Sequence, residues 1–335
     1  MLKVFGYAFN AIAPILMMVL LGYFLQARKI YDRSFFKTLN AFAFHYCFPP
    51  LMFTNLYALS GISEIRLGFL GFVMGMMVLI TFVSVGLAHI LTSVRNRRGV
   101  LIQAGFRANY GTLAIPLVEG LCGASGVAVA TSVQAPTVIY FNIVAVLVLA
   151  IYSENAEVDP AKIARNLLKN PMIQGLSAGV IALFIREWIP VGADGSMLFS
   201  LKRDIPFLYT GISYLSRLAT PLSLIALGGQ FRYADMANMK KEIVGGVLMR
   251  LVMAPAIGLS AAFLVSRSGL FAMSPAVVST LIAVFGAPIS TSSAVMAAEM
   301  QGDEALANQI VVWTSMFSML TIFLMAAFFR AIGYL

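Results

Sequence analysis

Long apolar stretches, separated by short connections, run through almost the whole chain. A helix needs about 20 predominantly apolar residues to cross the hydrocarbon core of a bilayer. Ten stretches approach or exceed this length, at about residues 5–26, 34–58, 66–92, 99–121, 125–152, 171–188, 206–230, 242–266, 273–299 and 305–330. Of the 335 residues, 60% are hydrophobic and 11% are charged, against about 25% charged in an ordinary soluble domain. The sequence therefore predicts an all-α integral membrane protein surrounded by the lipid bilayer.

Lysine and arginine residues gather in the odd-numbered connections between these spans. One cluster, Arg28 and Lys29, follows the first span, and another, Arg95, Arg97 and Arg98, follows the third. Because basic residues in short loops favour the cytoplasmic side, both termini are expected outside. The net charge of +9 is explained by this loop bias, so no nucleic-acid partner is expected.

The longest predicted cytoplasmic connection, residues 153–170, divides the spans five and five. In its segment DPAKIARNLLKNP, Asp159 takes the N-cap position and Pro160 the first helical position, which predicts a short amphipathic helix at the membrane surface. The chain is therefore predicted to form a first five-helix unit over 1–152, this cytoplasmic linker helix over 153–170, and a second five-helix unit over 171–335.

The ninth span contains the sequence VFGAPISTSSAVM, residues 284–296, in which glycine and proline lie two residues apart. Proline lacks a backbone donor and clashes with the preceding turn, so Gly286 and Pro288 predict a break about halfway along this helix. A broken helix in lipid needs protein, water or a ligand around it. The alternative is a kink that serves only helix packing.

The two halves of the chain resemble each other at their prolines. Pro50 in CFPPLMFTNL of the second span corresponds to Pro221 in LATPLSLIAL of the seventh. Gly111 and Pro116 in NYGTLAIPL of the fourth span correspond to the Gly-Pro pair of the ninth. Because five is odd, a second copy must enter the membrane with opposite polarity. The predicted fold is thus two inverted five-helix repeats, an architecture common in secondary transporters.

Five motifs, in order along the chain, resemble the auxin efflux carrier family of membrane transporters, in its bacterial form. They are FRANYGTLAIPLV (106–118), NP (170–171), ATPLSLIALGGQF (219–231), MRLVMAPAIG (249–258) and FGAPISTSSAVMA (285–297). The resemblance covers essentially the whole chain, and it implies a multi-pass protein of the bacterial inner membrane that forms a homodimer.

The resemblance also implies an architecture similar to the sodium/bile-acid symporters and sodium/proton antiporters. Helices one, two, six and seven would form a scaffold domain, and helices three to five and eight to ten a transport domain in which broken helices four and nine cross. Plant auxin exporters have a much longer central cytoplasmic loop, which this chain lacks, so auxin is not carried over as the substrate. Bacterial relatives are associated with small carboxylates such as malonate and malate.

A crossing of two broken helices predicts an anion site. With breaks at Asn109–Pro116 and Gly286–Pro288, each new half-helix would begin with free amides worth about half a positive charge. Hydroxyl groups after the second break could bind a carboxylate or cap the half-helix. The substrate-binding candidates at the breaks are Asn109, Tyr110, Gly111, Pro116, Gly286, Pro288, Ser290, Thr291 and Ser292.

Three arginines lie deeper inside predicted spans, where an unpaired charge costs at least about 2.5 kcal/mol. Arg107 and Arg250 either balance the charge of a substrate or pair with Glu119 of the fourth span and Glu299 of the ninth. Arg217, in the scaffold, either faces the substrate cavity or, as we expect, is structurally paired. The breaks themselves carry no aspartate or glutamate, which favours an anion carrier over a direct proton exchanger.

Two amides of the fifth span, Gln134 and Asn142, are eight residues apart and share roughly one helix face. They could contribute to substrate binding, or to a sodium site together with Asn109, or only to helix packing. The two histidines and two cysteines have no metal-ligand spacing, so we expect no metal centre and no cofactor beyond a coupling Na⁺ or H⁺.

The predicted function is secondary transport of a small organic anion, a mono- or dicarboxylate of the malonate and malate kind, by alternating access. No nucleophile and base are suitably spaced for an intramembrane enzyme, and no GxxxxGK[ST] phosphate loop is present. The alternatives are a sodium-coupled symporter of an organic anion and a membrane receptor or sensor for a small ligand.

Overall fold

The computed structural model describes residues 2–58, 67–153, 165, 168–190, 198–231, 233–267 and 269–335. Helices make up nearly all of these residues. The first half of the chain contains α1 (Leu2–Ala27), α2 (Arg33–Phe42), the π-helix η1 (Ala43–Cys47), α3 (Phe48–Tyr57), α4 (Leu67–Leu91), α5 (Arg95–Phe106) and α6 (Tyr110–Tyr152). The second half contains α8 (Pro171–Trp188), α9 (Leu201–Asp204), α10 (Pro206–Gln230), the 3₁₀-helix η2 (Tyr233–Asn238), α11 (Lys240–Leu248), the π-helix η3 (Met249–Met253), α12 (Ala254–Ser266), α13 (Pro275–Gly286), α14 (Ser292–Glu299) and α15 (Glu304–Ala331).

Each predicted span overlaps a helix, or a series of shorter helices, in the described chain. By length and composition, four helical stretches are long and apolar enough to cross a membrane, namely Leu67–Leu91, Ser125–Tyr152, Lys240–Ser266 and Glu304–Ala331. Shorter apolar helices cover Ala13–Ala27, Pro171–Arg186 and Pro275–Gly286. Large apolar side chains such as Phe82, Trp188 and Phe207 are exposed on the outside of the bundle, as expected of a surface in contact with lipid.

Prolines account for the irregular turns within two of the predicted spans. Pro49 follows η1, and Pro255 follows η3. Proline has no N–H group and so removes one helical hydrogen bond, and a wider π-turn precedes it in both places. A third proline, Pro171, occupies the first position of α8, where the missing donor costs nothing, and the Asn170 side chain caps this helix. Most of the predicted linker helix before it, including Asp159 and Pro160, lies outside the described residues.

A single glycine divides α6 into two legs. Gly123 has a φ of 67° and a ψ of −156°, a conformation that L side chains rarely adopt. Beyond it the chain folds back, and the hydroxyl of Tyr110 donates to the carbonyl oxygen of Ala130 at 2.8 Å. The two legs therefore lie side by side, in agreement with the predicted boundary between the fourth and fifth spans.

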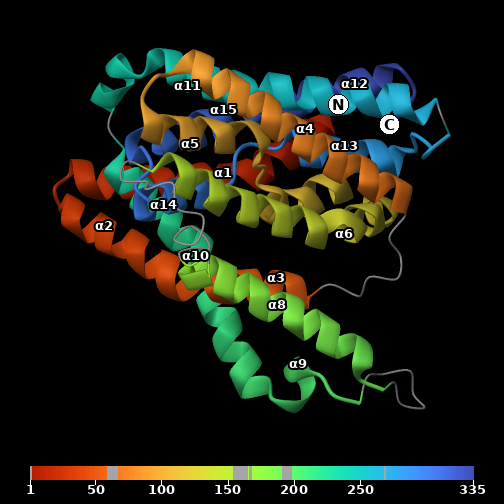
Figure 1. The fold of residues 1–335 in the computed structure, drawn as a ribbon, viewed down its shortest axis with the longest axis horizontal. Helices are drawn as coiled ribbons and strands as arrows, with labels where there is room; N and C mark the ends of the chain where they lie inside the picture. Colours follow the sequence, from red (N-terminus) through yellow and green to blue (C-terminus); the bar gives the residue numbers. More distant parts are fainter. Residues whose placement is uncertain are drawn as a thin grey trace.

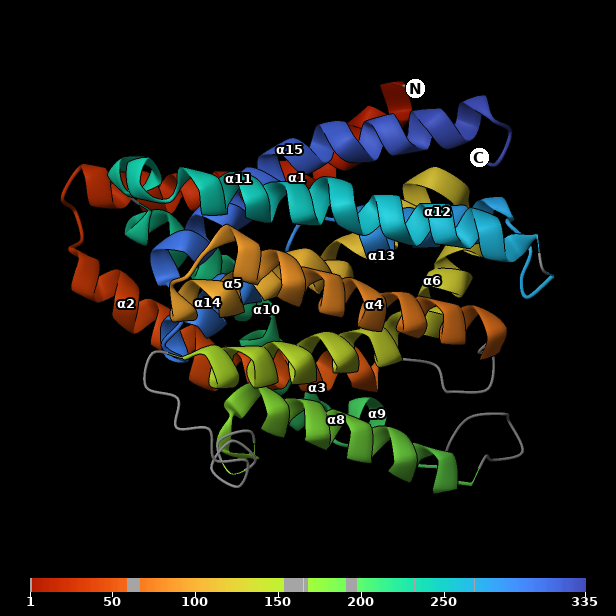
Figure 2. The ribbon, with the colours of Figure 1, turned by 45° about the horizontal axis from the view of Figure 1, so that its top comes forward.

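The helices pack in two groups. One consists of α1, α2, α3, α8 and α10, and the other of α4, α5, α6 and α11 to α15, with α1 packed on α10 of the first group and also on α6 and α15 of the second. In both views α3, α8 and α9 lie on one side of the molecule, whereas α11, α12 and α15 lie on the opposite side (Figures 1 and 2). Close backbone approach joins α1 to α10, because a Cβ atom on Gly228 would lie 1.9 Å from the carbonyl oxygen of Val19.

Both ends of the chain lie at the same end of the molecule, near the C-terminus of α12 (Figures 1 and 2). The turn between α1 and α2 and the beginning of α11 lie at the opposite end. Long helices such as α12 and α15 run between these two ends.

Candidate functional site

Two helix breaks from opposite halves of the chain meet near the centre of the molecule. The first break, Arg107 to Asn109, separates α5 from α6, and the second, Ala287 to Thr291, separates α13 from α14. Their backbones pass antiparallel, with an isolated β-bridge between Ala108 and Ile289. The amide of Asn109 donates to the carbonyl of Pro288 at 2.8 Å, and the amide of Ser290 to the carbonyl of Arg107 at 3.3 Å. Backbone groups freed by the breaks are thus satisfied by each other.

The sequence prediction of the breaks was right for the ninth span and displaced for the fourth. Gly286 ends α13, and Pro288 lies in the second break. In the fourth span, by contrast, the helix resumes at Tyr110, so Gly111 and Pro116 are inside α6 and not in the break. The physical reason is that the non-helical conformation of Arg107 to Asn109 is held by hydrogen bonds to the second break and not by a local proline.

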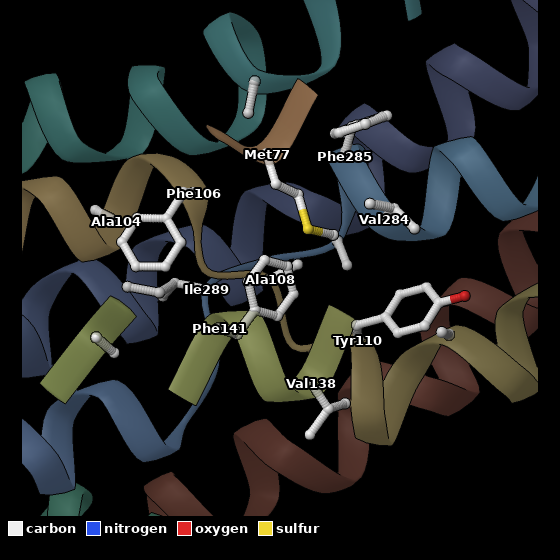
Figure 3. Close-up of a cluster of buried hydrophobic side chains, with 14 of the residues drawn as sticks. Met77, Ala104, Phe106, Ala108, Tyr110, Val138, Phe141, Val284, Phe285 and Ile289 are labelled. Carbon is white, nitrogen blue, oxygen red and sulfur yellow. The ribbon is translucent and has the colours of Figure 1, made fainter. Parts of the chain in front are cut away.

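Apolar side chains from α4, α5, α6 and α13 surround the crossing (Figure 3). Among them are Met77, Phe106, Phe141 and Phe285, all nearly inaccessible to solvent. The rings of Phe106 and Phe141 are in contact, with centroids 6.2 Å apart. The polar groups at the crossing are therefore held in an apolar, close-packed environment in which an unpaired donor is costly.

Arg107 is the charged residue of the first break, and its side chain is 2% exposed. Its Nη2 atom donates to Asn142 Oδ1 at 2.9 Å and to Ser292 Oγ at 2.8 Å, and its Nη1 atom donates to Gln103 Oε1 at 3.1 Å. Nη1 also contacts the sulfur of Met296 at 2.7 Å. All of these partners are neutral, and in the described part of the chain no carboxylate forms an ion pair with this guanidinium.

Several donors at the crossing have no partner in the structure. They include Arg107 Nε and Asn109 Nδ2, on two residues of the first break, and Gln103 Nε2, one turn earlier on α5. Asn109 is 4% exposed. Because an unpaired donor away from water costs about 1–3 kcal/mol, a hydrogen-bond acceptor bound at this position would stabilise the site.

A cavity of about 50 Å³ adjoins these donors. Its lining comes from α3 (Phe48, Leu51, Met52, Asn55), the first break (Arg107, Ala108, Asn109), α6 (Val138, Phe141, Asn142), α10 (Thr220) and the second break with the start of α14 (Ser290, Thr291, Ser292). No carboxylate belongs to this lining. The cavity therefore lies between the two packed groups of helices and offers hydrogen-bond donors in a volume that holds only a few water-sized groups.

Arg250, in η3, lies behind the crossing and is 1% exposed. Its Nε atom donates to the carbonyl of Ala287 at 2.8 Å, and Nη1 to the carbonyl of Gly105 at 3.2 Å. Nη2 donates to the carbonyl of Val284 at 3.1 Å and also to that of Phe285. Every one of these acceptors is a backbone carbonyl, and Arg250 does not line the cavity.

Of the two alternatives for these arginines, pairing with Glu119 and Glu299 is not seen among the described residues. Glu119 is exposed, and Glu299 accepts a hydrogen bond from Asn40 Nδ2 at 3.4 Å. The expected structural pairing of Arg217 is not found either, because this side chain is exposed on α10 and forms no ion pair with the described residues. Arg107 contacts neutral amides, a hydroxyl and a thioether, and Arg250 contacts backbone carbonyls.

Some of the remaining candidate residues line the cavity, and others lie away from it. Ser290, Thr291, Ser292 and Asn142 line the cavity, and the hydroxyls of Ser290 and Ser292 are 2.8 Å apart. The Tyr110 hydroxyl is used within α6, and Gln134 is half-buried away from the cavity lining.

Sequence reasoning missed three polar residues at the site. Asn55 and Thr220 line the cavity from the other group of helices, and Gln103 binds Arg107. A usable signal existed for two of them, since Asn55 lies five residues after Pro50 and Thr220 directly precedes Pro221, the prolines that correspond between the two halves.

No curated protein matches the chain in a sequence search. A scan against protein-family models matches residues 7–326 to the family described as "Membrane transport protein". Members of this family are transporters rather than enzymes, in agreement with the apolar helices and with the crossing of two broken helices. On this match over nearly its whole length, the chain belongs to the auxin efflux carrier family of membrane transport proteins.

Proposed function

We propose that this protein is a secondary transporter of a small organic anion, a mono- or dicarboxylate, that binds at the crossing of the two breaks. One observation carries the proposal: Arg107 and Asn109, both buried, have unpartnered N–H groups beside a cavity that no carboxylate lines. A carboxylate of a substrate has the oxygen acceptors that these donors lack.

The helix termini at the crossing add to the positive potential. α6 begins at Tyr110 and α14 at Ser292, directly after the two breaks. A helix N-terminus carries about half a positive charge on its free N–H groups. Together with the guanidinium of Arg107, the two termini favour an anion in a surrounding of low dielectric constant.

The size of the cavity supports an alternating-access mechanism. A volume of about 50 Å³ leaves too little room for a dicarboxylate, so the walls must separate for the substrate to enter. One wall comes from α3 and α10 and the other from the crossing itself. In this proposal α1, α2, α3, α8 and α10 form the scaffold of an inverted-repeat carrier with ten spans, and the other helices move as the transport domain. A homodimer in the bacterial inner membrane, joined through the scaffold, belongs to the same proposal.

The donors favour an anion over a sodium ion at this position. A sodium site requires oxygen ligands, and Asn109 Nδ2 and Arg107 Nε are donors. The Oδ1 atom of Asn142 already accepts from Arg107. The polar groups of the cavity are thus arranged for an acceptor-rich ligand.

The test is uptake of radiolabelled malonate, malate and acetate into proteoliposomes, with binding measured on the same purified protein. For Asn109→Ala we expect at least a tenfold loss of affinity, because a hydrogen bond to a charged group contributes about 1.5–3 kcal/mol. Asn238→Ala, an exposed asparagine of η2, is the matched control and should behave as the wild type. Binding without uptake would indicate a receptor, and normal binding by the Asn109 variant would contradict the site.

A further inference from the structure

Arg250 replaces helix donors that the two breaks remove. In a continuous helix the carbonyl of Val284 would accept from the amide of residue 288, but this residue is Pro288 and has no N–H group. Arg250 Nη2 donates to that carbonyl instead, at 3.1 Å. The carbonyl of Gly105 would likewise accept from the amide of Asn109, which donates to Pro288 across the crossing, and Arg250 Nη1 takes its place at 3.2 Å.

The same guanidinium therefore contacts the C-terminal ends of two half-helices. Gly105 lies in the last turn of α5, and Val284 and Phe285 lie in the last turn of α13. Each helix C-terminus carries about half a negative charge on its carbonyl groups. One guanidinium, with a single positive charge, thus cancels the two C-termini together, which leaves the N-termini of α6 and α14 and the charge of Arg107 uncompensated.

Carbonyl groups at the ends of broken helices are also a typical binding position for a coupling cation in secondary transporters. In this chain the position is filled by a guanidinium whose donors match the spread of the carbonyls. The π-turn η3, which precedes Pro255, brings the Arg250 backbone to this place.

We propose that Arg250 is a resident cation and a positioning residue: it ties the C-terminal ends of α5 and α13 together, and its charge keeps the potential at the crossing positive without a bound metal ion. The role of Arg250 in the positive potential rests on the anion site proposed above. Its role in holding α5 and α13 together depends only on its contacts with the four carbonyls, so the two roles can be tested separately.

The first test uses Arg250→Ala, purified in detergent, and measures its melting temperature with 0 to about 50 mM added guanidinium chloride, urea or sodium chloride. The variant leaves four carbonyls around an empty volume that a guanidinium ion fits. We expect a lower melting temperature than in the wild type, raised again by guanidinium but not by urea, which has nearly the same shape and no charge. Arg217→Ala, an exposed arginine, should show no such recovery.

Equal effects of guanidinium and urea would overturn the proposal, as would no recovery in a folded variant. If Arg250→Ala does not fold, Arg250→Lys and Arg250→Gln replace it. Lysine keeps the charge and glutamine keeps a donor without the charge, so the lysine variant should melt at the higher temperature. Equal melting temperatures would show that the charge at this position has no role.

A second measurement addresses the anion site. In wild-type proteoliposomes, uptake should be the same in sodium and in choline media, because the cation position is already filled. Dependence on sodium would contradict a resident cation. In Arg250→Ala the affinity for the anion should fall at least tenfold and recover with guanidinium. If no carboxylate is transported at all, the melting experiments still decide the role of Arg250, because they need no substrate.

Discussion

The backbone amide of Asn109 donates to the carbonyl oxygen of Pro288 at 2.8 Å. Pro288 interrupts the helix of the ninth predicted span, and its carbonyl oxygen also stabilises the break in the fourth predicted span. The Pro288 nitrogen cannot donate to the carbonyl of Val284, so Arg250 donates to this carbonyl instead. On the other side of Pro288, the amide of Ser290 donates to the carbonyl of Arg107 in the first break. The two breaks form one structural unit, and a change in either should affect both.

Restoring a continuous helix at the second break should weaken anion binding. Pro288→Ala supplies the missing amide for Val284, and Gly286→Ala adds about 1 kcal/mol of helix preference. The new methyl group at position 286 would meet Met325 Cε at 2.4 Å, which is the end of a flexible side chain and can move. We expect the double variant to fold and to lose most of its affinity for carboxylates, because a continuous helix removes the free amides of α14.

Melting temperature and carboxylate binding should be measured on the same detergent-purified sample of this double variant. A break that serves only as a packing kink predicts the reverse result, with poorer folding and near-normal affinity in the protein that survives. Normal binding in the folded variant would remove the second break from the anion site.

The position of the second break also depends on Thr314 of α15. The amide of Ile289 donates to Thr314 Oγ1 at 3.4 Å, and this hydroxyl in turn donates to the carbonyl of Ile310. For Thr314→Val we expect a loss of about 1–3 kcal/mol in the free energy of unfolding, because the buried amide of Ile289 is left unsatisfied. Thr321→Val is the matched control, since its hydroxyl donates only to Ser318 on the same helix. Equal melting temperatures for the two variants would refute the role of Thr314.

Helix positions and the break at Gly286 and Pro288 could be predicted because hydropathy, glycine and proline act locally. The break at Arg107 to Asn109 could not, because its non-helical backbone is stabilised by residues from the other half of the chain. The partners of Arg107 and Arg250 were missed for a related reason. Carboxylates can be found in a sequence, whereas the carbonyls that surround Arg250 become acceptors only where two helices end side by side.

Close packing of α1 on α10 should be sensitive to one methyl group. A Cβ atom at Gly228 would lie 1.9 Å from the backbone of α1, where no flexible side chain can give way. Gly211, on the same helix, has no atom within 4 Å of that position. We expect Gly228→Ala to lower the melting temperature by several degrees or to prevent folding, whereas Gly211→Ala should be neutral or raise it, because alanine favours the helix by about 1 kcal/mol. Similar melting curves would contradict the helix contact.

The orientation in the membrane can be tested with two exposed lysines, each in a helix next to a predicted span. Lys240 begins α11, on the side expected in the cytoplasm from the excess of basic residues, and Lys202 lies in α9, on the opposite side. Both side chains are exposed. Each is replaced by cysteine in a background without Cys47 and Cys122, and intact cells are treated with a maleimide that does not cross membranes. We expect labelling at position 202 only, with position 240 labelled after the cells are opened, because charged loop residues are retained on the cytoplasmic side during insertion. The reverse pattern would put both termini inside and would exchange the polarity of the half-helices at the crossing, whereas the contacts of Arg107 and Arg250 would be unchanged.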